Sequence, residues 1–202
     1  MLKEITIFDD EEFLRQVSKP VDFKNDKELE QNLKDLVEYT LNNNNAYAMA
    51  SIQLGIPKRI LFVKSTKEGI AATGEDNSLI LMINPVVISR KGKTQFWEAC
   101  ISGSNYIGLV ERPYEMVIKY QDRFGKEHTE KFEGFASTVL SHELDHLDGI
   151  FHMDRAKELH WVPFEERKEF RKDKHYTIIT KTCEFSYPAV EFKKYNEELE
   201  NY

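Results

Sequence analysis

The sequence has 202 residues, of which 41% are hydrophobic and 31% charged, a composition that supports one folded domain and excludes a disordered chain. The formal net charge of -7 argues against nucleic acid as a direct partner, because phosphate binding needs clustered lysine and arginine. No apolar run approaches the roughly 18 residues of a membrane span, and the N-terminus lacks the apolar stretch of a signal peptide. We therefore expect a cytoplasmic protein without membrane association, in which Cys100 and Cys183 are reduced thiols.

The first predicted element is an amphipathic helix at residues 25–43. Asn25 and Asp26 are candidates for its N-terminal cap, and a run of asparagines ends it. Its apolar side chains recur at helical spacing and are expected to pack into the core, namely Leu29, Leu33, Leu36 and Val37.

Two strands are predicted next, each preceded by a loop. Residues 46–57 are mostly small and are predicted as a loop. Residues 59–65 and 78–90 are rich in aliphatic and β-branched side chains, which favours strands. A second loop, at 66–77, joins them.

A hairpin and a second helix follow. Apolar and polar residues alternate over 114–122, and the pattern continues at 129–135 after a turn, which is typical of a β-hairpin. Residues 136–149 then predict a helix with Ser137 as its cap and Gly149 as its stop. Because strands flank the two helices without a regular alternation of strand and helix, the sequence predicts an α+β fold.

We expect a single domain over residues 1–202. Its last residues, about 188–202, are mostly charged and form either a terminal helix or a solvated tail. Four histidines lack a partner at metal-ligand spacing and are expected in surface or packing roles: His128, His152, His160 and His175.

The second predicted helix contains the stretch SHELDHLDG. His142 and His146 are four residues apart, so both imidazoles project from one face of a helix, a spacing that suits a divalent transition metal. Glu143 lies one position further round, where its carboxylate can take a proton from a metal-bound water. Asp145 and Asp148 are candidates to hydrogen-bond the outer imidazole N–H groups.

The alternative interpretation of this stretch is a solvated helix surface with alternating charges. The apolar residues within it predict instead a buried or half-buried helix: Val139, Leu140, Leu144 and Leu147. Burying two histidines and a glutamate without a partner would be costly, so a metal site is the better interpretation.

A catalytic metal site needs a third protein ligand and an open coordination position. Cys100, in the stretch FWEACISGSN, is the candidate, although taken alone it is typical of an ordinary buried free cysteine. Glu98 precedes it by two residues and has Arg112 as a candidate ion-pair partner. Such a pair contributes little if it is exposed, but near a substrate it can position the cysteine loop.

Three stretches, AYAMASIQLGIP, EACIS and HELDH, resemble the three signature motifs of the peptide deformylase family in pattern and in order. The resemblance extends to the opening helix and to INP, VERP and HLDGIFHMDR, and so covers most of the chain. It implies antiparallel or mixed β-sheets packed around a central HExxH metal-binding helix, with an N-terminal amphipathic helix. It also implies a metallohydrolase that removes the N-terminal formyl group from formyl-methionyl peptides and releases formate.

In that family the motif cysteine and the two helix histidines bind the metal, and they correspond here to Cys100, His142 and His146. The resemblance implies one ion per chain, Fe²⁺ in the native state, with Zn²⁺, Ni²⁺ or Co²⁺ as substitutes. Imidazole and thiolate ligands suit several of these ions, so the sequence leaves the native metal open.

The resemblance further implies the catalytic roles. Glu143 is the general base and later passes the proton to the leaving amine. Gln53 and the backbone N–H of Ile101 hold the formyl oxygen as it gains negative charge, which is the work of an oxyanion hole. An inactive homologue that only binds metal, peptides or ribosomes is disfavoured, because Glu143 is not needed to hold a metal.

The chain departs from the family pattern around these residues. Ala46, Ala48 and Ala99 stand where the family has glycine, and Tyr47 replaces an aliphatic residue. Each alanine adds a methyl group where a ligand approaches, and a left-handed conformation there would cost about 1–2 kcal/mol. We predict Tyr47, Ala48, Ala99 and Arg112 as substrate contacts.

Phe96 and Trp97 also make the approach to Cys100 bulky, which favours a side-chain pocket narrower than methionine needs. This supports a deformylase-like enzyme for a different amide, and the alternative is neutral drift within an ordinary deformylase. The expected partners are N-formylated nascent peptides, with the ribosome as a further candidate. We expect no direct nucleic-acid binding and a monomer.

Overall fold

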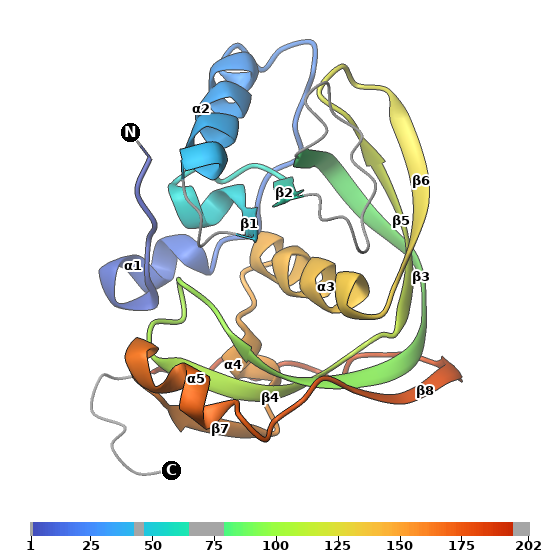
Figure 1. Cartoon of the computed structure of the whole chain (residues 1–202). Helices are drawn as coiled ribbons and strands as arrows, with labels where there is room; N and C mark the ends of the chain where they lie inside the picture. The colour runs from blue at the N-terminus through green and yellow to red at the C-terminus, as the bar shows by residue number, and fades with distance from the viewer. Residues whose placement is uncertain (1, 43–46, 65–78, 196–202) are drawn as a thin grey trace.

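The computed structural model in Figure 1 describes residues 2–42, 47–64 and 79–195. The predicted loop at 66–77 and the alanine at position 46 lie outside the described residues. The described helices and 3₁₀ turns are α1 (Ile7–Leu14), α2 (Leu29–Asn42), η1 (Ser51–Leu54), α3 (Phe135–Leu147), α4 (His152–Arg155), η2 (Phe164–Glu166) and α5 (Arg167–Phe170). The described strands are β1 (Ala48–Ala50), β2 (Ile60–Lys64), β3 (Leu79–Ala99), β4 (Tyr106–Arg112), β5 (Glu115–Gln121), β6 (Glu127–Glu133), β7 (Glu158–Trp161) and β8 (Thr177–Glu184).

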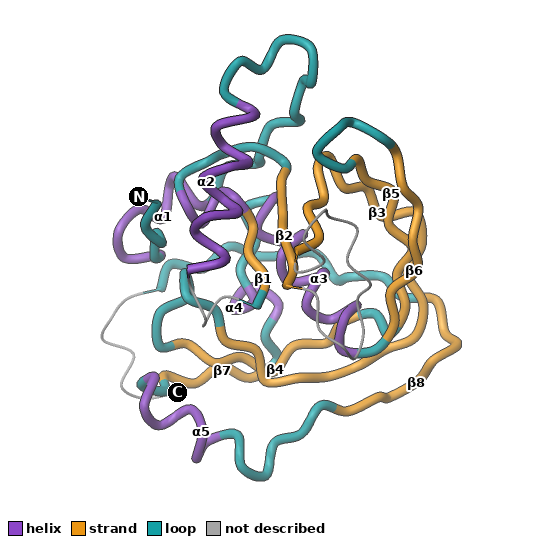
Figure 2. Tube along the Cα trace, turned by 45° about the horizontal axis from the view of Figure 1, so that its top comes forward, coloured by secondary structure: helices purple, strands orange, loops and turns teal. Residues whose placement is uncertain are grey.

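The described strands form one sheet centred on the long strand β3. The first part of β3 pairs with β2, its middle with β5, and its last part with β4 and β8. β1 extends the sheet beyond β2, β6 beyond β5 and β7 beyond β4. All of these pairings are antiparallel, and the sheet curves around α3 (Figures 1 and 2). The expected α+β class is confirmed, and the sheet is antiparallel in the described part of the chain.

A bend in β3 accompanies this curvature. Asn84 has a left-handed φ of 52°, and the pairing with β5 shifts register between Ile83 and Val86. Asparagine tolerates a positive φ better than most residues. Its side-chain amide accepts a hydrogen bond from the Val21 N–H at 2.7 Å and donates one to the Val21 carbonyl oxygen at 3.0 Å. The bulge therefore turns the strand while its polar groups stay satisfied.

The two longest helices pack on opposite faces of β2. Side chains alternate along a strand, so Leu61 and Val63 belong to the core cluster of α3, whereas Ile60 and Phe62 belong to that of α2. α2 contributes the predicted apolar stripe, of which Leu29, Leu33 and Leu36 are buried and Val37 is partly buried. α3 contributes Leu140, Leu144 and Leu147. The SHELDHLDG helix is thus a core helix and not a solvated surface.

The ends of the predicted helices differ in detail from the sequence prediction. Ser137 is not a cap, because α3 begins at Phe135 and the Ser137 hydroxyl donates to the Pro113 carbonyl oxygen at 2.8 Å. Gly149 ends the helical segment as predicted, with a φ of 70°. A Cβ there would lie 2.2 Å from the carbonyl oxygen of Arg15, so no other residue fits without a shift.

Several elements were not predicted from the sequence. Residues 46–57 contain β1 and η1 in place of a plain loop, and the strand predicted at 78–90 continues to Ala99. The predicted hairpin is present as β5 and β6, but α1, β4, β7 and β8 are additional. No helix forms over 188–195, and the buried Tyr195 donates its hydroxyl to Asp154 at 3.1 Å.

Both cysteines are free thiols in the structure, Cys100 buried and Cys183 exposed. Among the described helices, none combines the length and the apolar composition that crossing a bilayer requires.

Candidate metal centre

Three potential ligand atoms converge between α3 and the end of β3. The Cys100 Sγ lies 3.2 Å from His146 Nε2, which lies 3.2 Å from His142 Nε2, and all three atoms fall within 4.8 Å of one another. A tetrahedral ion with bonds of about 2.0–2.3 Å holds its ligand atoms roughly 3.3–3.8 Å apart. The spacing and the thiolate and imidazole donors therefore fit one transition-metal ion.

The local fold explains why these residues meet. α3 is a buried helix, so His142 and His146 present their rings on one face, one turn apart. Cys100 directly follows β3, whose last residues pair with β4 at Trp97 opposite Leu109 and Ala99 opposite Ile107. The sheet thus fixes the cysteine loop against the helix.

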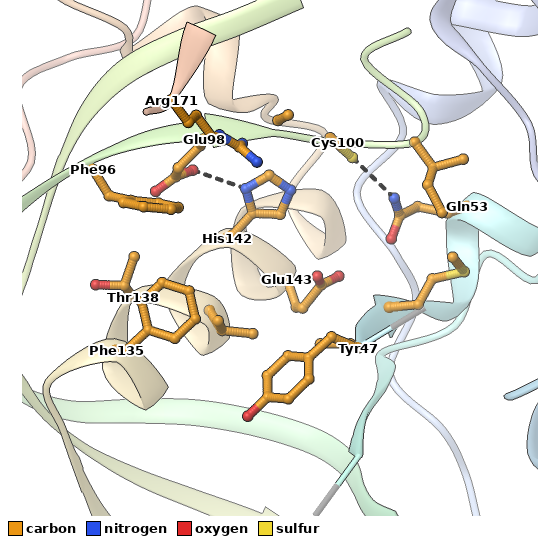
Figure 3. A pocket seen from close by; sticks show the side chains of 15 residues that line it. Tyr47, Gln53, Phe96, Glu98, Cys100, Phe135, Thr138, His142, Glu143 and Arg171 are labelled. Carbon is orange, nitrogen blue, oxygen red and sulfur yellow. Dashed lines mark hydrogen bonds and ion pairs between the residues drawn. The ribbon is translucent and has the colours of Figure 1, made fainter. Parts of the chain in front are cut away.

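The outer nitrogen of His142 is bound by a carboxylate. His142 Nδ1 lies 2.8 Å from the Glu98 carboxylate (Figure 3). This carboxylate also accepts two hydrogen bonds of 2.8 Å from Arg112 Nε and Nη2. Burial alone would raise the pKa of Glu98, but Arg112 and His142 more than offset burial and hold it well below its usual range. A carboxylate at Nδ1 leaves Nε2 free to bind an ion, the usual arrangement behind a ligand histidine.

The prediction that Asp145 and Asp148 hydrogen-bond the outer imidazole N–H groups is therefore wrong. Asp145 accepts hydrogen bonds from Arg155 at 2.6 and 2.8 Å and contacts Arg112, and Asp148 pairs with Arg59 at 2.7 Å. These carboxylates are occupied by arginines, so they serve the surrounding ion-pair network.

Arg112 is also placed differently from the prediction. The Glu98–Arg112 ion pair exists, but the Arg112 side chain is fully buried and does not line the pocket. The prediction of Arg112 as a substrate contact is wrong, because β4 directs this side chain behind Glu98. Its guanidinium also donates a hydrogen bond to the Tyr187 hydroxyl oxygen at 3.3 Å.

The pKa values of the two histidines are shifted in opposite directions. Burial lowers the pKa of both, but Cys100 and Glu98 raise that of His142 well above its usual value. The pKa of His146 stays well below its usual value because of burial and of the charge on His142. Cys100 and Glu98 thus attract positive charge to this point, which is the electrostatic condition for cation binding.

Glu143 lies beside the ligands with an unsatisfied oxygen. Its side chain is buried, and Oε2 has no hydrogen-bond partner among the described residues. Burial raises the pKa of Glu143 to about 7, partly offset by the charge on His142. A carboxyl group with this pKa and a free oxygen suits proton transfer near neutral pH.

Gln53 and Ile101 flank the cysteine. Gln53 lies in η1, where its Oε1 accepts from the Ala50 N–H at 3.0 Å and its Nε2 donates to Ser102 Oγ at 3.1 Å. The same Nε2 lies 3.3 Å from Cys100 Sγ, as drawn in Figure 3. These contacts fix the orientation of the amide, so that its N–H₂ group faces the site.

A pocket of about 340 Å³ opens on this cluster. It is lined by Tyr47, Ala48, Met49, Gln53, Phe96, Glu98, Ala99, Cys100, Ile101, Phe135, Thr138, Val139, His142, Glu143 and Arg171. Tyr47, Ala48 and Ala99, which were predicted as substrate contacts, line this pocket, whereas His146 is buried and does not line it. Neither Ala48 nor Ala99 has a positive φ, so the strain considered for a left-handed alanine does not arise there.

Two further side chains lie near the site: the sequence predicted a surface or packing role for His152 and gave no signal for Arg171. His152 is buried and stacks on His142 with ring centroids 5.6 Å apart, and burial lowers its pKa to about 3. Its expected packing role fits this environment. Arg171 lines the pocket from the end of α5, and no motif or spacing in the sequence signals it.

Comparisons with known proteins identify one family for most of the chain. Residues 2–161 match the family model described as polypeptide deformylase. The peptide deformylase of Nautilia profundicola is 36% identical over 160 residues, which cover 79% of this chain and 86% of that protein. A probable peptide deformylase from Synechococcus phage S-SSM7 superposes with a TM-score of 0.63 at 33% identity, covering 77% of this chain and 99% of the other. A Met-Ala-Ser-bound class I type b peptide deformylase from Acinetobacter baumannii gives 0.64 at 25% identity, covering 77% and 98%.

Proposed function

Because this chain belongs to the polypeptide deformylase family, we propose that Cys100, His142 and His146 bind the ion of a metallohydrolase that removes the N-terminal formyl group from peptides. The convergence of the three ligand atoms beside the free oxygen of Glu143 is the observation that carries the proposal. Fe²⁺ is the proposed native ion, one per chain, with Zn²⁺, Ni²⁺ and Co²⁺ as functional substitutes. A bound divalent ion would supply Lewis acidity and lower the pKa of water in the pocket.

The residues around the ligands have separate tasks in this proposal. Glu143 takes a proton from the attacking water and passes it to the amine nitrogen as the carbon–nitrogen bond breaks, so that formate and a free N-terminus result. The Gln53 Nε2 and the Ile101 N–H donate to the formyl oxygen as it becomes negative. The fixed position of the Gln53 amide supports this role, because only the 3.3 Å contact from Nε2 to the Cys100 Sγ has to be exchanged for the formyl oxygen.

Turnover of formyl-Met-Ala-Ser by iron-loaded protein, purified without oxygen, tests the function. We expect formate release from the wild type and none from His146→Ala, in which one ligand is missing. Metal content is measured in both proteins. Ion-loaded wild type that releases no formate from any formylated peptide would contradict the proposal.

Replacing Gln53 by alanine is expected to lower kcat by about 10²–10³-fold, because one donor to the developing oxyanion is lost. KM for the same peptide should change much less, since the donor acts mainly in the transition state. Steady-state kinetics on formyl-Met-Ala-Ser measure both constants. The exposed Gln31→Ala, on α2, is the matched control and should leave both unchanged. An equal change in KM and none in kcat would assign Gln53 to ground-state binding.

Two further properties are proposed. The whole described chain forms one catalytic domain, because residues after 161 pack on β3 through β8 and on the pocket through Arg171. We also propose a cytoplasmic monomer that acts on formylated nascent peptides, with the ribosome as a partner. Light scattering and ribosome co-sedimentation test both points.

The second candidate function is deformylation with a changed preference for the first residue of the peptide. Aromatic rings narrow the pocket: Phe96 and Phe135 meet edge to face with centroids 5.3 Å apart, and Tyr47 lines the opposite wall (Figure 3). An inactive homologue is not favoured, because both Gln53 and Glu143 line the same pocket as the ligands.

A further inference from the structure

The segment after the family match adds a charged side chain to the pocket. The match ends at residue 161, and Arg171 lies ten residues beyond it, directly after α5. Arg171 lines the pocket together with Phe96 and Glu98, on the side of His142 away from Gln53 (Figure 3). This part of the pocket is therefore not determined by the three signature motifs.

Contacts to β3 fix the position of the Arg171 guanidinium. Its Nη2 donates to the Trp97 carbonyl oxygen at 2.9 Å, and its central carbon lies 5.5 Å from the centre of the Phe96 ring. Phe170, the preceding residue, packs edge to face on Trp97 with centroids 5.1 Å apart. The guanidinium is thus held by β3 and the Phe96 ring, and the residue before it by Trp97, which limits the loss of entropy when it binds a ligand.

The donors of this guanidinium are not used up. Arginine has five N–H donors, and Arg171 Nε is buried without a hydrogen-bond partner among the described residues. No carboxylate of the described chain lies within 4.0 Å of its nitrogens. Glu98 lines the same pocket, but its oxygens are already bound by Arg112 and His142.

A second arginine increases the local positive charge. Arg167 contacts the Ser104 carbonyl oxygen, its Nε is also buried without a partner in the described chain, and no described carboxylate forms an ion pair with it. Burial and the charge on Arg167 lower the pKa of Arg171. The charge on Glu98 offsets part of this effect, but neither arginine forms an ion pair with a described carboxylate, and a ligand carboxylate would supply one.

We propose that Arg171, held over Phe96 at the wall of the pocket, selects formylated peptides whose first side chain carries a carboxylate. The inference rests on the deformylase function proposed above and names the preferred substrate class. A guanidinium matches a carboxylate with two parallel hydrogen bonds, whereas the thioether of methionine is only a weak acceptor. A methionine side chain would desolvate Arg171 without replacing the lost hydrogen bonds.

The test compares kcat/KM for three C-terminally amidated peptides, formyl-Glu-Ala-Ser, formyl-Gln-Ala-Ser and formyl-Met-Ala-Ser. The amide removes the C-terminal carboxylate, so only the first side chain differs in charge. The wild type is expected to prefer the Glu peptide over the Gln peptide at least tenfold, as one charge-assisted hydrogen bond predicts. Arg171→Gln should bring this ratio to about 1, and Arg171→Lys, which keeps the charge but not the fork, should give an intermediate ratio.

Lys172→Gln is the matched control, since it removes the same charge from an exposed neighbour and should keep the wild-type ratio. A wild-type ratio of 1 or less, or an equal loss on all three peptides in Arg171→Gln, would overturn the inference. Calorimetric binding of the same peptides to ion-loaded Glu143→Gln protein separates the two proposals. If no peptide is hydrolysed but the Glu peptide binds at least tenfold more tightly than the Gln peptide, the deformylase function fails and the recognition by Arg171 stands.

Discussion

Glu143→Gln is expected to lower kcat/KM for formylated peptides by about 10²–10⁴-fold while the protein keeps its bound ion. The substitution keeps the size of the side chain and removes the group that accepts and returns the proton. Glu143 does not supply any of the three converging ligand atoms, so metal content should stay at the wild-type value. Formate release and metal analysis on the same preparation measure both quantities. Loss of the ion in Glu143→Gln would contradict the assignment, because it would make Glu143 a ligand.

The pH dependence should follow the same carboxyl group. A general base acts in its deprotonated form, so kcat/KM is expected to rise with pH and level off above the pKa of Glu143. Burial raises this pKa to about 7 without an ion, and a bound cation lowers it from that value. The acidic limb of the profile should therefore lie below pH 7 and disappear in Glu143→Gln.

The stability of the protein without metal gives an independent test of the raised pKa of Glu143. A pKa that rises from 4.5 to about 7 on folding means that stability is lost as the pH rises between these values, by about 3 kcal/mol in total. Ion-free Glu143→Gln should consequently unfold at higher denaturant concentration than ion-free wild type at pH 8, and the gap should close at pH 4. Equal stability at both pH values would show that Glu143 is well solvated in the unloaded site.

The sequence predicted the parts of the site that depend on local geometry. The spacing of His142 and His146 is a property of one helix, and the apolar residues around them indicated that this helix is buried. Cys100 lies about forty residues before His142 in the sequence. Residue spacing alone therefore could not predict that it meets the histidines, and the family resemblance was needed.

The errors concern side chains whose direction depends on the sheet. Arg112 was predicted at the substrate, but the pairing of β4 with β3 turns it inward onto Glu98. Asp145 was predicted behind an imidazole, yet two arginines from β4 and α4 bind it. Arg171 was not predicted, because its position depends on how a short helix after the last motif packs on Trp97. Tertiary packing decided each of these three positions.

Arg112→Leu is expected to lower the free energy of unfolding by about 3–5 kcal/mol, because it leaves a buried carboxylate without its main partner. Arg112 is fully buried, donates two hydrogen bonds of 2.8 Å to Glu98 and also contacts Asp145. Leucine fills part of the volume but supplies no donor. Denaturant unfolding of the ion-loaded protein at pH 7 measures the loss. Lys119→Met removes an exposed ion pair with Glu127 and, as the control, should cost no more than about 1 kcal/mol.

The effect of Arg112→Leu should depend on pH and extend to the metal. The pKa of Glu98 is held low in the folded protein, so the stability that the pair provides is present above the unfolded value of 4.5 and fades as the pH falls below it. Glu98 orients His142 through Nδ1, so metal affinity should also fall by about 10–100-fold. Glu98→Gln added to Arg112→Leu removes the unpaired charge and should recover part of the stability, although a neutral amide orients His142 less strongly. Recovery of stability without recovery of metal affinity would separate the two roles of the Glu98 carboxylate. If Arg112→Leu alone were as stable as the wild type, Glu98 would have found solvent or another cation in place of Arg112.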